Sequence, residues 1–105
     1  MQSIIFIMGV SGSGKTTVGK LLHEQTGFPF FDADDFHPAA NIEKMKAGVP
    51  LTDDDRAGWL RTLNALAKVH VAAGAIIACS ALKLKYREQL AQGLQQVQWI
   101  YLKGT

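Results

Sequence analysis

The chain has 105 residues, of which 48% are hydrophobic, and its formal net charge is +2, so it is expected to form one small domain with a hydrophobic core. The small charge and the lack of a basic block argue against a nucleic-acid-binding surface, and no apolar run approaches the roughly 18 residues that a membrane span needs. Cys79 is the single cysteine, which excludes an internal disulfide bond and fits a reducing, cytoplasmic environment.

Predicted strands and helices alternate along the chain. In order, they are a strand at 4–8, a helix at about 15–25, a strand at 28–31, a helix from Pro38 to Gly48, a helix that starts after Thr52 and stops near Gly74, a strand at 75–79, a helix at about 82–92 and a strand at 97–102. The strands at 4–8 and 75–79 are continuously apolar, which is typical of parallel strands covered on both faces. Trp59 fits the core-facing stripe of its helix better than a stacking platform. The alternation predicts an α/β domain with a parallel sheet.

A glycine-rich loop follows the first predicted strand and opens the first predicted helix. Residues 9–16 read GVSGSGKT, a complete match to the phosphate-binding pattern G-x-x-x-x-G-K-[ST]. Glycines let the backbone wrap closely around an anion, and the helix start adds its positive dipole end. Lys15 is expected to reach the β- and γ-phosphates of a nucleoside triphosphate, and the Thr16 hydroxyl to hold Mg²⁺. The predicted phosphate-binding residues are Gly9, Val10, Ser11, Gly12, Ser13, Gly14, Lys15, Thr16 and Thr17.

Two carboxylates stand at the end of the second predicted strand. Because side chains alternate along a strand, Asp32 and Asp34 are expected to point to the same side, at the edge where α/β proteins bind ligands. One can hold a Mg²⁺-bound water, and the other can accept the proton of an attacking hydroxyl. The structural alternative is that these acids cap a turn before Pro38, a role that suits Asp35.

Four further residues are candidates for holding an anionic substrate. Arg56 follows three acids at a helix start and is either an anchor for a carboxylate or a surface charge. Lys83 and Arg87 are four residues apart and share one helix face, where they form either an anion site or part of a basic surface. His37 follows the paired carboxylates and is a candidate for substrate contact.

More specific motifs follow one another in order along the chain. They are the loop at 9–16, D-A-D at 32–34, HPAANIEKM at 37–45, GVPLTDDDR at 48–56, and CSALK at 79–83 with a Tyr-Arg pair at 86–87. On these residues the chain resembles the gluconokinases, ATP-dependent kinases of the shikimate-kinase-like P-loop group. The resemblance covers nearly the whole chain.

The resemblance implies a three-layer α/β/α fold with the parallel sheet order 2-3-1-4. It also implies transfer of the γ-phosphoryl group of ATP to the 6-hydroxyl of D-gluconate, with Asp34 touching the reacting substrate and Asp32 supporting Mg²⁺. Arg56, His37 and Lys83 become substrate-side residues, and a homodimer is expected. Members of the group continue into a fifth strand and an arginine-bearing lid, so residues 1–105 are expected to be a kinase core that ends before the lid, binds phosphates and turns over slowly.

Other functions remain open at this point. A related P-loop kinase acting on another small hydroxy acid or on a nucleotide satisfies the same basic residues, and so does a non-catalytic nucleotide-binding fragment. A GTPase-like switch is disfavoured, because the DRAG sequence at 55–58 does not follow an apolar strand and the chain lacks the N-K-x-D motif that reads guanine.

Overall fold

The computed structural model describes residues 3–9, 14–80 and 84–102. Its elements are β1 (Ile4–Met8), α1 (Lys15–Thr26), β2 (Phe30–Asp32), a 3₁₀ turn η1 (Ala33–Phe36), α2 (Ala39–Lys46), α3 (Asp53–Val69), β3 (Ala75–Cys79), α4 (Leu84–Ala91) and β4 (Val97–Tyr101). No helix in this part of the chain is long and apolar enough to cross a membrane.

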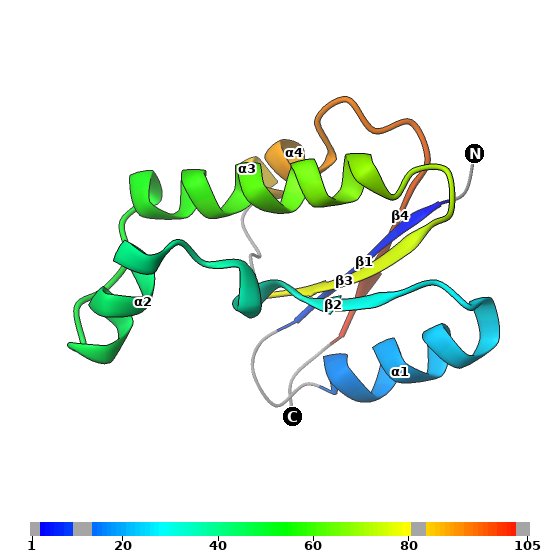
Figure 1. The fold of residues 1–105 in the computed structure, drawn as a ribbon, viewed down its shortest axis with the longest axis horizontal. Helices are drawn as coiled ribbons and strands as arrows, with labels where there is room; N and C mark the ends of the chain where they lie inside the picture. Colours follow the sequence, from blue (N-terminus) through cyan, green and yellow to red (C-terminus); the bar gives the residue numbers. More distant parts are fainter. Residues whose placement is uncertain (1–2, 10–13, 81–83, 103–105) are drawn as a thin grey trace.

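The four strands form one parallel sheet in the order β2-β3-β1-β4, which confirms the predicted order. β1 lies in the middle, with Ile4 level with Ala75 on one side and with Val97 on the other. Helices α3 and α4 cover one face of the sheet and α1 covers the other, so the fold has three layers (Figure 1). Parallel strands joined by helices require this arrangement, because each crossover places its helix on a face of the sheet.

The hydrophobic core is divided between the two faces by side-chain alternation along the central strands. On β1, Phe6 belongs to the cluster beneath α3 and α4, which also contains Leu60 and Leu63 of α3. Its neighbours Ile5 and Ile7 belong to the second cluster, which packs against α1. Every residue of β1 and β3 is buried, as the continuously apolar runs predicted.

Helix α1 approaches the sheet closely because Gly19 has no side chain. A Cβ placed on Gly19 would overlap the aromatic ring of Phe30 on β2, and Gly19 is the buried residue of α1. The helix ends as the sequence predicts, at Gly27, whose left-handed backbone (φ 77°) lets its N–H donate to the carbonyl of His23. These contacts set the position of the helix that follows the glycine-rich loop.

Several element boundaries differ from the prediction, among them the end of α3, which lies at Val69 and not near Gly74. Two of the differences have a reason in hydrogen bonding. β2 begins at Phe30 rather than at residue 28, because the Phe28 N–H donates to the Thr26 hydroxyl at 3.0 Å and Pro29 has no N–H to donate. Pro38 is the N-cap of α2 rather than its first helical residue, since its carbonyl accepts from the N–H of Asn41 at 2.9 Å and α2 begins at Ala39.

Candidate functional site

The carboxyl ends of the four strands bring the predicted site segments to one edge of the sheet. Parallel pairing places Met8 of β1 level with Cys79 of β3 and with Tyr101 of β4, and Asp32 ends β2 at the same edge. The Gly9 N–H donates to the Cys79 carbonyl at 3.4 Å, which extends the pairing just past the strand ends. Ligands of open α/β sheets gather at this edge.

The start of α1 is arranged to receive an anion. Gly14 has a left-handed backbone (φ 96°) and no side chain with which to cap the helix, and the first turn holds no acidic residue. Lys15, the first helical residue, donates from Nζ to the Gly9 carbonyl at 2.6 Å, so its side chain reaches from the end of the glycine-rich loop to its beginning. Thr16 and Thr17 are exposed beside it. The N-terminal end of a helix dipole and a lysine side chain therefore lie close together at the start of α1.

Helix α3 shows the opposite arrangement at its start. The Thr52 hydroxyl accepts from the Asp55 N–H at 3.1 Å, and the Asp55 carboxylate accepts from the Thr52 N–H at 2.9 Å, which completes a capping box. Three aspartates fill its first turn, where negative charge suits the helix dipole. The two helix starts therefore differ, because side chains of the chain itself cap α3, whereas Gly14 provides no side-chain cap for α1. Val10, Ser11, Gly12 and Ser13 of the loop lie outside the described residues.

The two carboxylates after β2 do not share one face of a strand. β2 ends at Asp32, and Asp34 lies in η1, so the expectation that strand alternation aligns them is wrong. The Asp32 carboxylate instead accepts from the Asp34 N–H at 3.0 Å and caps η1, which agrees with the structural alternative that these acids cap a turn before Pro38. Asp34 is exposed and Asp32 half-buried. Within the described residues, no hydrogen bond reaches the second oxygen of Asp32, which therefore remains available to a ligand.

His37 is held by contacts on one ring face and at one ring nitrogen. Its imidazole stacks on the indole of Trp59, with ring centroids 4.3 Å apart and planes at 16°. The Nδ1 atom lies 3.2 Å from Nδ2 of Asn41. Burial lowers the pKa of His37 below its usual 6.5, and the positive charge of Arg56 lowers it further, whereas the negative charge of Asp34 acts in the opposite direction. Asp34, His37 and Arg56 are therefore close enough to interact electrostatically.

Trp59 is a core residue, which confirms the prediction, and its indole also stacks on the imidazole of His37. Its side chain is 3% exposed and belongs to the cluster under α3. Its indole N–H donates to the Ala33 carbonyl at 2.7 Å, which connects α3 to the 3₁₀ turn that carries Asp34. The histidine therefore packs on a ring whose own position is fixed.

The first turn of α3 is connected to α2 and to α4. Lys44 of α2 donates from Nζ to both carboxylate oxygens of Asp55, at 2.9 and 2.8 Å. These bonds, followed by the Thr52 N–H, lower the pKa of Asp55 from 3.8 to about 2. On the other side, Arg56 donates from Nη1 to the Tyr86 hydroxyl at 3.4 Å.

Asp53 completes the connection between α3 and α4. Its carboxylate accepts a hydrogen bond from the Tyr86 hydroxyl and pairs with Lys85 at 2.6 Å. The hydrogen bond from Lys85 to Asp53 raises the pKa of that lysine. The first turn of α3, which carries Arg56, is therefore bonded to α2 on one side and to α4 on the other.

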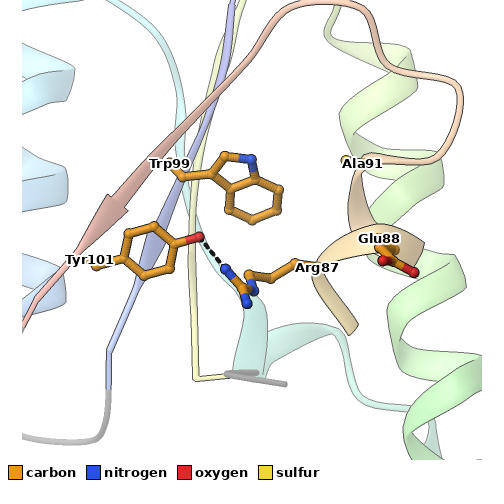
Figure 2. Close-up of a pocket in the computed structure, with 5 residues that line it drawn as sticks. All are labelled: Arg87, Glu88, Ala91, Trp99 and Tyr101. Carbon is orange, nitrogen blue, oxygen red and sulfur yellow. Dashed lines mark hydrogen bonds between the residues drawn. The ribbon is translucent and has the colours of Figure 1, made fainter. Parts of the chain in front are cut away.

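Arg87 lies against β4 rather than with His37 and Arg56. It donates from Nη1 to the Tyr101 hydroxyl at 2.6 Å, and its guanidinium lies 5.5 Å from the centre of the Tyr101 ring. Figure 2 shows the guanidinium between α4 and β4, in an open pocket of about 240 Å³ lined by Arg87, Glu88, Ala91, Trp99 and Tyr101. Its Nε is buried without a partner among the described residues. Lys83, its predicted companion, lies outside those residues.

Three polar residues of this region received no role from the sequence. Asn41 is 3% exposed and contacts both His37 and the backbone of α3, Lys44 holds Asp55, and Tyr86 lies between Arg56 and Asp53. Asn41 and Met45 are four residues apart and share one face of α2, whereas His37 precedes the helix, so spacing within the helix gave no signal for the contact between Asn41 and His37. In the described part of the chain, no three His, Cys, Asp or Glu side chains are grouped so as to hold a metal ion by themselves.

Comparison with known proteins connects this geometry to one family. A sequence model described as shikimate kinase matches residues 11–105. The chain is 51% identical over 92 residues to a probable gluconokinase of Mus musculus, which covers 86% of this chain and 50% of the mouse protein. It is 48% identical over 103 residues to the thermoresistant gluconokinase of Escherichia coli K12, which covers 96% of this chain and 59% of that protein. The chain therefore spans about half of the length of these relatives.

A solved structure has the same fold over the whole chain. The unliganded sugar kinase of Janibacter sp. HTCC2649 superimposes with a TM-score of 0.91 at 42% identity, covering 100% of this chain and 62% of that one.

Proposed function

Since the chain belongs to the shikimate kinase family, we propose that it provides the phosphate-binding and acceptor-binding parts of a kinase that transfers the γ-phosphoryl group of ATP to the 6-hydroxyl of D-gluconate. One observation carries the proposal. The anion-accepting start of α1 lies at the same sheet edge as the group formed by Asp34, His37 and Arg56. The similarity to the mouse and Escherichia coli gluconokinases supports gluconate as the acceptor.

On the nucleotide side, the residues from Gly9 to Thr17 would bind the phosphates through backbone N–H groups and the helix dipole. Lys15 would exchange its bond to the Gly9 carbonyl for bonds to the β- and γ-phosphates, for which only its flexible side chain has to move. Thr16 and Asp32 would hold Mg²⁺ through the Thr16 hydroxyl and the second oxygen of Asp32. When bound, the ion neutralises negative charge on the phosphates.

On the acceptor side, Asp34 would accept the proton of the 6-hydroxyl as this oxygen attacks the γ-phosphorus. Its exposure beside η1 makes it accessible to a substrate. His37 and Arg56 would bind the hydroxyls and the carboxylate of gluconate, and the planar guanidinium of Arg56 matches a carboxylate. Lys83 and Arg87 complete the proposed substrate-binding set, although Arg87 would have to exchange its bond to Tyr101 to take part.

The test is gluconate-dependent ADP formation with Mg-ATP, measured together with ATP binding by calorimetry. We expect Lys15→Met to abolish both, because the replacement keeps the length of the side chain and removes its charge. Lys20→Met is the matched control, since Lys20 is an exposed lysine of the same helix and its change should leave binding and rate unaltered. A folded chain that binds no Mg-ATP would refute the nucleotide part of the proposal.

Other acceptors should be compared with gluconate in the same assay, because the family model that matches is described as shikimate kinase. We expect shikimate, and a nucleoside monophosphate, to give much less ADP than gluconate. The reverse ranking would refute the gluconate assignment and leave the kinase assignment intact.

The proposal includes a cytoplasmic location, which the single cysteine favours, and assembly into a homodimer, which the resemblance implies. Sedimentation of the purified chain measures the second point, and a monomer at micromolar concentration would contradict it.

A further inference from the structure

Asn41 is a buried amide that contacts two other segments with one atom. Its Nδ2 lies 2.9 Å from the Asp55 carbonyl of α3 and 3.2 Å from Nδ1 of His37. A carbonyl oxygen can only accept, so the atom facing Asp55 must be the NH₂ group and not the amide oxygen. That NH₂ group has a second hydrogen, which it donates to Nδ1 of His37.

This contact decides where His37 carries its proton. A ring nitrogen that accepts a hydrogen bond is unprotonated, so the neutral imidazole has its hydrogen on Nε2. The stack on Trp59 and the i,i+4 bond to Asn41 fix the plane of the ring as well. Around the ring, burial and Arg56 of α3 favour the neutral form, Asp34 of η1 opposes it, and Asp55 of α3 is occupied by Lys44.

We propose that Asn41 is a positioning residue that holds His37 as the neutral Nε2–H tautomer, so that His37 donates a hydrogen bond to an oxygen of the sugar acid and does not accept the proton of the attacking hydroxyl. The substrate in this statement rests on the proposed function, whereas the tautomer does not. No hydrogen bond within the described residues reaches Nε2 of His37, so this N–H is available to a ligand. Proton acceptance then falls to Asp34.

The same amide sets the distance between two substrate-binding side chains. By donating to the Asp55 carbonyl, Asn41 fixes α2 to the residue that precedes Arg56. A change at Asn41 therefore acts on the histidine and on the arginine together. Asn41, His37 and Arg56 lie outside the start of α1. We therefore expect a change at Asn41 to weaken binding of the acceptor and to leave ATP binding unaltered.

The tautomer is measured directly by nitrogen NMR of the ring nitrogens in the full chain without ligand. We expect Nε2 of His37 to carry the hydrogen and Nδ1 to have the shift of an unprotonated nitrogen, with His37→Gln identifying the signals. His23 is an internal reference, because its Nδ1 lies 2.6 Å from the Phe28 carbonyl and must be the donor, which is the opposite tautomer. A hydrogen on Nδ1 of His37, or equal populations of the two forms, would overturn the proposal without any variant.

Two substitutions test the cause. Asn41→Asp puts a carboxylate against Nδ1, so we expect the hydrogen to move to Nδ1 and the pKa of His37 to rise. Asn41→Leu removes the donor, and we expect a mixture of tautomers. Asn64→Leu is the matched control, since Asn64 is also buried and donates to two carbonyls, those of Leu90 and Gln92, but lies between α3 and α4. It should lower stability and leave the His37 spectrum unchanged.

The kinetic test separates this inference from the function on which it rests. We expect Asn41→Asp to raise the KM for gluconate about tenfold, the size of one lost hydrogen bond, and to leave the KM for Mg-ATP unchanged. An unchanged tautomer in Asn41→Asp would refute the positioning role. A switched tautomer in a chain that phosphorylates another acceptor but not gluconate would uphold the role of Asn41 and refute gluconate as the substrate.

Discussion

Replacing glycine by alanine at two helical positions should have opposite effects on stability. A Cβ at Gly19 would meet three atoms of the Phe30 ring, all within 2.8 Å, whereas a Cβ at Gly58 in α3 would have its nearest neighbour, an Arg61 nitrogen, at 3.8 Å. Alanine in a helix interior gains about 0.5–1 kcal/mol over glycine. Overpacking a core contact costs about 1–3 kcal/mol. We therefore expect Gly58→Ala to stabilise the fold by about 0.5–1 kcal/mol and Gly19→Ala to destabilise it by about 1–2 kcal/mol.

Urea unfolding measures both free energies, and an unchanged m-value shows that only stability has changed. The double variant Gly19→Ala with Phe30→Leu tests the cause, because a smaller, branched side chain leaves room for the added methyl. We expect Phe30→Leu to cost less in the Gly19→Ala background than alone, with a coupling energy above about 0.5 kcal/mol. If Gly19→Ala were as stable as the parent chain, or if both alanines shifted stability in the same direction, the close approach of α1 to β2 would not be as described.

Two other predictions concern the connections around α3. The lowered pKa of Asp55 means that its stabilising contribution is complete above pH 3.8 and is lost as the pH falls toward about 2. The difference in urea midpoint between the parent chain and Asp55→Asn should therefore shrink across that range, and a difference that stayed constant would contradict the bond from Lys44. Trp59→Phe keeps a ring beside His37 but leaves the buried Ala33 carbonyl without its donor, so unfolding should become easier by about 1–3 kcal/mol. A loss below about 0.5 kcal/mol would show that this hydrogen bond matters little.

Patterns within one segment predicted most of the fold. The apolar runs at β1 and β3 were placed correctly because both strands are buried on both faces, and the Thr52 cap of α3 follows from the acids beside it. The position of Asp34 was not accessible in this way. The backbone of Asp34 leaves the strand conformation, and its N–H donates to the Asp32 side chain. Residue propensities do not reveal that Asp32 is the acid that accepts this hydrogen bond.

The sequence predicts the glycine-rich loop from one motif, but it does not reveal the contacts between segments in the candidate site. The spacing from Gly9 to Lys15 defines the loop by itself. The role of Asn41 depends on α3 lying beside α2, which no local pattern specifies. The side on which Arg87 lies was equally hidden, because α4 has α3 along one side and β4 along the other (Figure 2).

The central place of β1 has a consequence for the order in which the molecule can fold. Ile4 pairs with Ala75 and with Val97, so β1 finds its partners only after the intervening helices α1, α2 and α3 have been synthesised. Such distant pairings slow folding, since a long loop must close before any ladder bond forms. Until then, the run from Ile4 to Met8 is an unprotected apolar segment. It is therefore the part of the nascent chain most in need of a chaperone.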